Sequence, residues 1–161
     1  MMTTAILDLA DEAATIRLGQ GLAGLARPGD VVALGGTLGV GKTTLARAFI
    51  RALTTPDEEV PSPTFTLVQT YDTDAGVVWH FDLYRIERPG DAFELGLDDA
   101  LADGITLIEW PERLGPLLPR RRLDVVLEAG AGSGRRARLT GWEEDRLAAL
   151  SRHHHQGGGP C

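Results

Sequence analysis

Several residue types are scarce in this chain of 161 residues, and each scarcity excludes a class of site. Cys161 is the only cysteine, so neither an intramolecular disulfide nor a cysteine-rich metal site can form. Three of the four histidines are consecutive, at 153–155, which leaves His80 as the only histidine of the expected folded body. A histidine-based zinc site or a Ser-His-Asp triad therefore has almost no residues from which to form there.

Long apolar runs and an excess of basic residues are also missing. No run approaches the length of a membrane span, and no basic and then apolar signal segment opens the chain. The net charge of −7 and the pI near 5.0 argue against a protein that grips nucleic acid with its whole surface. We expect a cytoplasmic protein with one domain, residues 1–151, and a flexible tail, residues 152–161, to which we assign no function.

Lys42 is the only lysine, and it lies within a phosphate-binding motif. The stretch from Gly36 to Thr43, GTLGVGKT, matches G-x-x-x-x-G-K-S/T at every fixed position. A lysine ammonium is a compact point charge that can bridge two phosphates, and the planar guanidinium of arginine is not interchangeable with it. All the other lysine or arginine residues of the chain are arginines. A lysine at this one position therefore favours a functional motif over a chance match.

The segments on both sides of the motif have the character that a phosphate-binding loop requires. Residues 30–34 form a short apolar run typical of a buried strand, and residues 43–53 carry apolar side chains at helical spacing. The backbone N–H groups of residues 39–43 would then surround phosphates at a helix N-terminus, where the helix dipole favours anions. Thr43 would bind Mg²⁺ through its hydroxyl, with Thr44 beside it. The sequence therefore predicts a nucleoside triphosphate site.

The remaining pattern predicts an α/β fold in which strands and helices do not alternate strictly. Two strands in a row follow the helix of the motif, which is not the pattern of a purely parallel sheet. We therefore expect a P-loop NTPase fold with a mixed, partly antiparallel central sheet flanked by helices. The further predicted strands are residues 64–71, 77–83, 105–109, 123–128 and 137–140, and the further helical segments are residues 11–26, 89–101 and 142–150.

Acidic residues that could serve the phosphates end two of the predicted strands. Asp82 follows an apolar run at 77–81, and Glu109 follows another at 105–108. A P-loop needs a carboxylate at the carboxyl end of a neighbouring strand to hold Mg²⁺ or its water ligands, so both acids are candidate catalytic and metal residues. The turn from Pro61 to Thr64 lies where loops that sense a γ-phosphate occur, and an ordinary turn is the alternative.

Four motifs together resemble the TsaE family, small bacterial ATPases needed to form threonylcarbamoyladenosine in tRNA. The chain carries them in the family's order and spacing, as GVGKTT at 39–44, SPTFTLV at 62–68, HFDLYR at 80–85 and IEWPE at 108–112. The resemblance implies ATP and Mg²⁺ as ligands and two protein partners, TsaB and TsaD, of which TsaD carries out threonylcarbamoyl transfer. tRNA would be contacted only indirectly through that complex, and no membrane would be involved.

The resemblance also implies roles for individual residues. Thr43 and either Glu109 or Asp82 would handle Mg²⁺, and Thr64 would lie in the switch region. The other expected residues would surround the phosphates, the base and the sugar. The full nucleotide-binding set is Leu38, Gly39, Val40, Gly41, Lys42, Thr43, Thr44, Glu12, Thr15, Thr64, Trp110 and Gly134, with Glu12, Thr15 and Gly134 near the base and sugar.

One position departs from the family pattern. The family usually has an acid after the first glycine of the loop, and this chain has Thr37. If that acid helps to activate water, hydrolysis is weaker here or depends on Glu109 or Asp82. Nucleotide binding should survive, because backbone amides and Lys42 supply most of it.

Two other functions compete with an ATPase. A small-molecule kinase would need an acceptor pocket and an arginine-bearing lid, for which residues 120–122 are a candidate, although the flanking prolines also suit a rigid surface turn. A GTP-dependent switch is disfavoured, because the N/TKxD motif needs a lysine and the only one is already in the P-loop. The arginines at 120–122 and 135–138 could contact tRNA phosphates or an acidic partner, or could simply offset the 23 acids.

Overall fold

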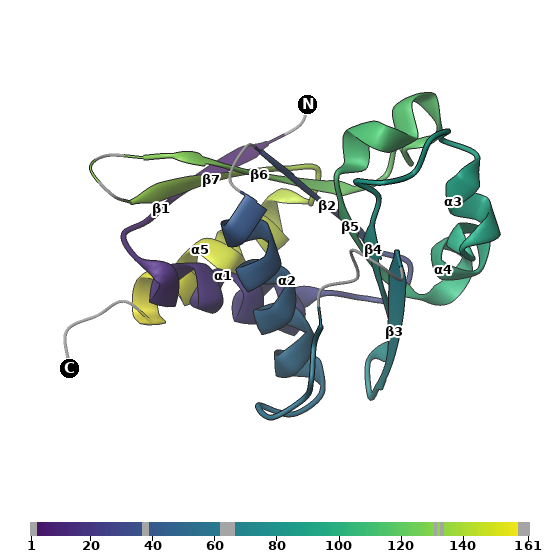
Figure 1. Cartoon of the computed structure of the whole chain (residues 1–161). Coiled ribbons are helices and arrows are strands. Elements are labelled where there is room, and N and C mark those ends of the chain that lie inside the picture. The colour runs from purple at the N-terminus through teal and green to yellow at the C-terminus, as the bar shows by residue number, and fades with distance from the viewer. Residues whose placement is uncertain (1–2, 37–38, 62–66, 131, 133, 158–161) are drawn as a thin grey trace.

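A seven-stranded mixed sheet forms the centre of the molecule, and helices lie on both of its faces (Figure 1). The computed structural model describes residues 3–36, 39–61, 67–130, 132 and 134–157. The strands, in the order β1-β7-β6-β2-β5-β4-β3, are β1 Thr4–Leu9, β2 Val31–Gly36, β3 Val68–Thr73, β4 Gly76–Asp82, β5 Ile105–Glu109, β6 Leu123–Ala129 and β7 Arg135–Thr140. The helices are α1 Glu12–Leu25, α2 Gly39–Leu53, α3 Asp91–Glu94, α4 Leu97–Asp103, the 3₁₀ segment η1 Pro111–Leu117 and α5 Glu144–Gly157.

The middle of the sheet is parallel and its two ends are antiparallel. β2 pairs with β5 and β6, and β4 pairs with β5, all in parallel register. β3 lies beside β4 as a hairpin, and β7 pairs with both β6 and β1 in antiparallel register. In the hairpin turn, the hydroxyl of Thr73 accepts a hydrogen bond from the N–H of Ala75 and donates one to the carbonyl of Gly76. The predicted mixed, partly antiparallel sheet is confirmed.

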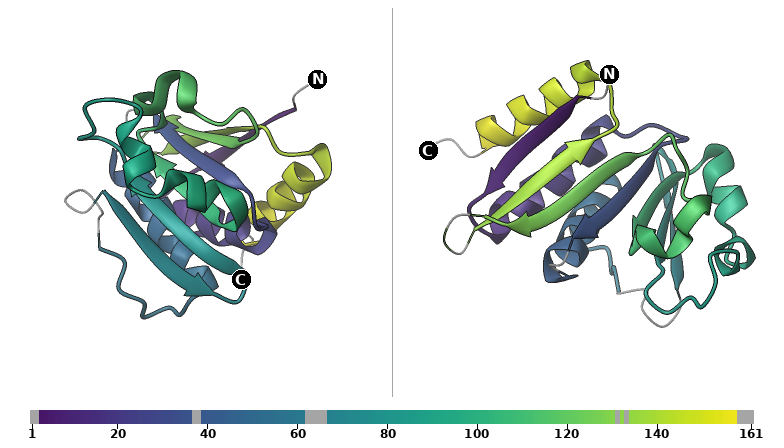
Figure 2. Two further views of the ribbon diagram at one scale, coloured as in Figure 1. Left: turned by 90° about the vertical axis from the view of Figure 1, so that its right-hand side faces the viewer. Right: turned by 90° about the horizontal axis from the view of Figure 1, so that it is seen from above.

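Two apolar cores form, because successive side chains of a strand point to opposite faces of the sheet. On β2, Val32 and Leu34 belong to the larger core and Val31 to the smaller one. Figure 1 shows α1, α2 and α5 gathered on one face of the sheet, over the larger core. The smaller core lies on the other face, where α3, α4 and η1 cover β4 and β5, as Figure 2 shows. Burial on both faces explains why β2 and β5 consist mainly of apolar residues.

The first helix begins where the sequence predicts and is held tightly against the helix of the P-loop. The Asp11 carboxylate caps α1, because its Oδ1 accepts a hydrogen bond from the N–H of Ala14 at 2.9 Å. At Gly19 the two helices approach so closely that a Cβ atom would lie 2.7 Å from the carbonyl oxygen of Leu45. Glycine is therefore required there, and α1 and α2 form one packed pair.

The C-terminal helix is longer than predicted. The predicted end at Leu150 is wrong, because α5 continues to Gly157. His154 is 7% exposed, and its Nε2 lies 3.0 Å from the backbone oxygen of Asp8 on β1. Close by, a Cβ atom on Gly21 of α1 would lie 2.6 Å from the ring of His153. Residues 152–157, expected in a flexible tail, are therefore helical, and His80 is not the only histidine of the folded body.

The N-terminal strand has no counterpart among the predicted elements. In β1, Ile6 and Asp8 are exposed while Leu7 and Leu9 are buried, the alternation typical of a strand with one covered face. For β3, the described strand begins at Val68, and the predicted part at 64–66 lies outside the described residues. Within the described ranges, no helix has the length and apolar character needed to cross a membrane.

Candidate functional site

The last residue of β2 has to be glycine, and α2 begins shortly after it in the sequence. Gly36 has φ +109°, and a Cβ atom there would lie 2.0 Å from the carbonyl oxygen of Leu127. α2 begins at Gly39, so the predicted start at Thr43 is wrong. Gly39, Val40 and Gly41, which were expected in the loop, already form the first turn of α2. The N–H groups of a first helical turn have no partners within the helix. Leu38 and Thr37 lie outside the described residues.

Lys42 is a buried cation at this helix start. Its side chain is 1% exposed, and its Nζ donates a hydrogen bond to the carbonyl of Gly36 at 3.0 Å. The same Nζ lies 3.9 Å from the centroid of the Trp110 ring. No carboxylate in the described part of the chain forms an ion pair with it. The site therefore holds a positive charge that only a carbonyl and a ring face stabilise, which favours an incoming anion.

Trp110 owes its position over Lys42 to an unusual backbone conformation. It directly follows β5 and has φ 61° and ψ 51°, the left-handed region that residues other than glycine seldom adopt. Its ring also contacts that of Tyr84, with centroids 4.9 Å apart. Such local strain occurs preferentially at functional sites. Of the residues expected near the nucleotide, Trp110 thus lies directly beside Lys42.

Glu109 connects the helix start to a buried histidine. Glu109 is 3% exposed at the end of β5, and its Oε1 accepts a hydrogen bond from the hydroxyl of Thr43 at 3.4 Å. Its Oε2 lies 2.7 Å from Nε2 of His80, which therefore carries the proton and donates it. His80 is 1% exposed, and its position on β4 two residues before Asp82 was the one sequence signal for its role. The histidine orients the carboxylate toward Thr43.

Asp82 lies beside Glu109 at the same edge of the sheet. The two acids are register partners on β4 and β5, so their side chains share one face. Asp82 is 6% exposed, and its Oδ1 accepts a hydrogen bond from the N–H of Tyr84 at 3.1 Å. Its own N–H donates to the carbonyl of Leu67 at 2.9 Å. Both acids therefore lie where the strand order was expected to put them, and Glu109 accepts a hydrogen bond from Thr43.

Arg135, which the sequence indicated only as a member of the arginine cluster at 135–138, lies beside the start of α2. It begins β7, and a Cβ atom on Gly41 would lie 3.5 Å from its Nε. This Nε is buried and has no hydrogen-bond partner within the described ranges. The arginine cluster at 135–138 is therefore divided, because Arg136 and Arg138 form ion pairs with Asp8 and Glu128 away from the loop.

The residues expected around the base and sugar lie on two sides of the loop. Glu12 and Thr44 line a cavity of about 430 Å³ between α1 and α2. Thr15 is 1% exposed, and its hydroxyl has no partner among the described residues. Gly134 closes the β6–β7 turn by accepting a hydrogen bond from the N–H of Gly130 at 3.0 Å. Thr64 lies outside the described residues.

The oxygen donors at the site suit a hard cation that takes most of its ligands from a bound molecule and water. The hydroxyl of Thr43 and the carboxylate of Glu109 are oxygen donors of the kind that Mg²⁺ prefers. In the part of the chain that the structure describes, no group of three or more His, Cys, Asp or Glu residues could hold a metal ion alone. Mg²⁺ would therefore need further oxygens from phosphates and water, which is its usual coordination beside a nucleotide.

Comparison with known proteins agrees with the motifs. The sequence model of a family described as "Threonylcarbamoyl adenosine biosynthesis protein TsaE" matches residues 9–137. The chain belongs to the TsaE family. All four motifs that carry the resemblance lie within the matched residues, so the family prediction is confirmed.

Individual TsaE proteins match over most of their length. The tRNA threonylcarbamoyladenosine biosynthesis protein TsaE of Rickettsia bellii (strain RML369-C) is 40% identical over 120 residues, 74% of this chain and 83% of the relative. The protein of that name from Bacillus subtilis (strain 168) is 36% identical over 119 residues, 73% of each chain. The crystal structure of Bacillus subtilis YdiB matches with a TM-score of 0.73 and 26% identity, over 99% of both chains. The P-loop α/β fold is therefore shared along nearly the whole chain.

Proposed function

We propose that this TsaE-family chain is an ATPase that binds and hydrolyses Mg-ATP to support the formation of N6-threonylcarbamoyladenosine in tRNA. The observation that carries the proposal is the buried ammonium of Lys42 at the first turn of α2, beside the Thr43–Glu109–His80 chain of hydrogen bonds. A helix start and an unpaired lysine are suited to polyphosphate, and the hydroxyl–carboxylate pair is suited to its metal ion.

Each group at the site then has a part in the reaction. The N–H groups of residues 39–43 and the ammonium of Lys42 would bind the β- and γ-phosphates. Thr43 and Glu109 would hold Mg²⁺, which when bound neutralises phosphate charge. Glu109 is preferred to Asp82 for this role because it is hydrogen-bonded to Thr43. Asp82, next to it on β4, would orient the attacking water.

Two further features support binding of the whole nucleotide. The unpartnered Nε of Arg135 lies next to Gly41, where a phosphate oxygen would complete its hydrogen bonding. The cavity between α1 and α2 could take the base or sugar, because Glu12 and Thr44 line it at the helix starts. The hydroxyl of Thr15 is a further unsatisfied donor in this region.

The family resemblance supplies the proposed partners. TsaB and TsaD would form the complex with this chain, and TsaD would carry out the transfer chemistry. The net charge of −7 suits a protein that contacts tRNA only indirectly. Turnover should therefore be slow for the chain alone and should rise in the complex.

A small-molecule kinase remains the alternative, and the position of the arginine turn weakens it. Arg120 to Arg122 immediately precede β6, whose first residue pairs with the start of β2. The P-loop follows the other end of β2, so this turn does not cover the phosphate site. A kinase lid would have to come from another segment.

The decisive experiment measures ATP turnover by this chain alone and with a TsaB–TsaD pair, with tRNA present and absent. We expect slow turnover alone and a rise when the pair is added. Phosphate transfer to a small acceptor, with no response to the pair, would replace the ATPase proposal with the kinase alternative.

A further inference from the structure

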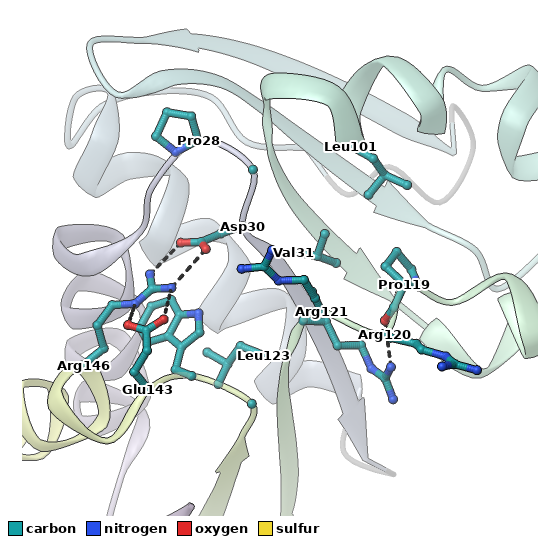
Figure 3. Close-up of a pocket in the computed structure, with 14 residues that line it drawn as sticks. Pro28, Asp30, Val31, Leu101, Pro119, Arg120, Arg121, Leu123, Glu143 and Arg146 are labelled. Atoms are coloured by element: carbon teal, nitrogen blue, oxygen red, sulfur yellow. Dashed lines mark hydrogen bonds and ion pairs between the residues drawn. The ribbon is translucent and has the colours of Figure 1, made fainter. Parts of the chain in front are cut away.

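A second pocket lies at the edge of the sheet opposite the candidate site. It has a volume of about 600 Å³ and lies between the loop before β2, the turn before β6, the segment after β7 and the start of α5 (Figure 3). β2 runs from the pocket at Val31 to the phosphate loop at Gly36. Five steps of 3.3 Å along a strand put roughly 17 Å between the two sites. The volume is typical of a small-molecule site.

This pocket is locally basic in an acidic protein. Its charged lining residues are Arg120, Arg121, Arg122, Arg146, Asp30 and Glu143. Four arginines and two acids give a formal charge of +2, whereas the whole chain carries −7. A concave surface with an excess of one charge concentrates ligands of the opposite charge, so the pocket favours anions.

The two acids of the pocket are already paired with one buried arginine. Arg146 is 7% exposed, and its terminal nitrogens donate to the two carboxylate oxygens of Asp30 at 2.7 and 3.1 Å. Its Nε donates to Glu143 at 3.0 Å, and its guanidinium lies 4.0 Å from the centroid of the Trp142 ring. Arg146 therefore forms part of the pocket wall and is not available to a ligand.

The other three arginines of the pocket differ in how many contacts they make with the rest of the chain. Arg122 donates to Asp124 at 2.8 Å and to the carbonyl of Pro119 at 2.7 Å. Arg120 and Arg121 are exposed and form no ion pair or side-chain hydrogen bond with the rest of the described chain. Figure 3 shows the side chain of Arg121 reaching across the hollow toward Asp30. Two guanidinium groups are thus free to bind an anion.

We propose that this pocket binds a small organic phosphate, a phosphomonoester whose dianion pairs with Arg120 and Arg121. A phosphomonoester carries close to two negative charges at neutral pH on one group, which matches the excess charge of the lining. The guanidinium fork binds phosphate oxygens in pairs. The carbon part of the ligand would contact the apolar lining at Val31, Leu101 and Pro119.

An extended nucleic acid is a poorer fit than a small molecule. RNA binding draws its affinity from a row of phosphate contacts along a basic stripe. The nearest arginines on the sheet, Arg136 and Arg138, are instead paired with Asp8 and Glu128. Within the described chain, these two arginines therefore do not extend the basic lining of the pocket into a stripe along the sheet.

The three tryptophans permit a test that resolves the two sites. Trp142 lines the pocket, Trp110 lies over Lys42, and Trp79 packs against Gly96. Their indole N–H resonances would be followed by NMR while glycerol 2-phosphate is added to the full chain in excess Mg-ADP. We expect only the Trp142 resonance to shift, and to shift to saturation. Because Trp110 reports separately on the P-loop, failure of nucleotide binding would be recognised independently.

Charge-removing variants show whether the arginines are responsible. Arg120→Gln combined with Arg121→Gln should weaken binding about tenfold or more, since charged hydrogen bonds are lost. Arg152→Gln removes an exposed charge from α5 outside the pocket and should leave the affinity unchanged. Unchanged thermal unfolding would show that both variants are folded. An unmoved Trp142 resonance, or a double variant that binds like the wild type, would overturn the proposal.

Parallel titrations separate the possible sources of the anion. Glutarate carries the same charge on two carboxylates, and an oligoglutamate peptide represents an acidic protein segment. A response to either one without a response to glycerol 2-phosphate would overturn the proposal. Inorganic phosphate should bind more weakly than the ester, because it lacks the carbon part. Equal affinity for the two would show that the apolar lining takes no part and would contradict an organic ligand.

Discussion

Lys42 combines burial with an incomplete electrostatic environment. Lys42 is 1% exposed, and among the described residues its ammonium is stabilised by the carbonyl of Gly36 and the face of Trp110. A buried ion with no opposite charge is destabilising by several kcal/mol, even after relaxation. The fold maintains this arrangement, which is a physical reason to expect that an anion completes it.

Replacing this lysine should therefore remove the main attraction for phosphate. We expect Lys42→Ala to abolish tight ATP binding, because the β- and γ-phosphates then lose the buried ammonium that would pair with them. Lys42→Arg should also bind poorly, since the bulkier guanidinium has no room at a buried position. Calorimetric titration with Mg-ATP checks both variants. Wild-type affinity in Lys42→Ala would disprove the P-loop assignment.

The two acids should differ in how their loss affects the metal. We expect Glu109→Ala and Asp82→Ala each to lower ATP turnover by about a hundredfold or more, with folding intact. Glu109→Ala should also lose the Mg²⁺ dependence of ATP affinity, because Glu109 is hydrogen-bonded to Thr43. Asp82→Ala should keep it. Glu112→Ala, an exposed acid of η1, is the matched control. Normal turnover in both site variants would show that the catalytic site is elsewhere.

His80 should act through Glu109 as a positioning residue. His80→Leu removes the hydrogen bond to the carboxylate, and we expect it to lower Mg²⁺-dependent ATP affinity about tenfold or more. His80→Gln keeps an N–H donor near the same position and should recover part of that affinity. Titration of ATP binding with Mg²⁺ measures the effect, and thermal unfolding controls for stability. Equal Mg²⁺ dependence in the wild type and His80→Leu would refute this role.

The sequence points to those candidate site residues whose chemistry is local. Lys42 and Thr43 belong to a contiguous motif, and Glu109 ends an apolar run. The roles of His80 and Arg135 depend instead on neighbours that are distant in the chain, Glu109 through the β4–β5 register and Gly41 through the start of β7. Strand register and helix docking cannot be read from one sequence without a pairing partner, so these contacts were not predictable.

At the scale of elements, the predictions succeeded where burial is continuous and failed at the edges. β5 has the predicted bounds, because all five of its residues are buried. β1 was missed, since an edge strand with one covered face alternates over too few residues to stand out. The end of α5 was placed too early, because histidine was treated as a polar tail residue although His154 is buried. The P-loop α/β fold follows from the central elements alone.

Arg146 joins three elements, and its loss should destabilise the fold. It binds Asp30 before β2, Glu143 before α5 and the carbonyl of Leu25 at the end of α1. Removing one partner of a buried ion pair leaves the other charge uncompensated. We expect Arg146→Ala to lower the free energy of unfolding by about 3 kcal/mol. The melting temperature should then fall by roughly 6–12 °C in thermal unfolding.

An exposed ion pair provides the control for this element. Arg136→Ala breaks its pair with Asp8, in which both side chains are largely exposed, and should change stability by less than about 1 kcal/mol.

A hydrogen bond from Arg146 lowers the pKa of Glu143 below its usual value of 4.5. The stability that this bond contributes is present above pH 4.5 and is lost as the pH falls toward the lowered pKa. The role of Arg146 would be contradicted if Arg146→Ala had wild-type stability and lost stability at acid pH as the wild type does.

At the scale of the whole molecule, the sheet has chemically distinct ends. The carboxyl ends of β2, β4 and β5 present Glu109, Asp82 and the buried Lys42. The opposite end carries the basic pocket with Arg120 and Arg121. Ligands of parallel sheets commonly bind at the carboxyl ends of strands, which favours the first end for catalysis. A partner that responds to nucleotide should therefore contact the carboxyl edge.

Partner binding should depend on the nucleotide state of the chain. Residues 62–65 lie between α2 and β3 in sequence, and the family resemblance makes them the expected switch segment. If a partner completes the catalytic geometry, its binding is coupled to the nucleotide state. We expect recovery of a TsaB–TsaD complex in pull-downs to differ between ATP, ADP and no nucleotide, and turnover to rise in the complex.

Substitution of Thr64 should separate nucleotide binding from the response to the partners. Thr64→Ala should bind ATP with near wild-type affinity, because Lys42 and the helix start supply most of the binding. Its turnover should no longer rise when TsaB and TsaD are added, since the switch can no longer sense the γ-phosphate. Thr66→Ala, in the same segment, is the matched control. Equal recovery of the complex in all three nucleotide states would argue against a switch, and the small-molecule kinase would then become the better explanation of the phosphate site.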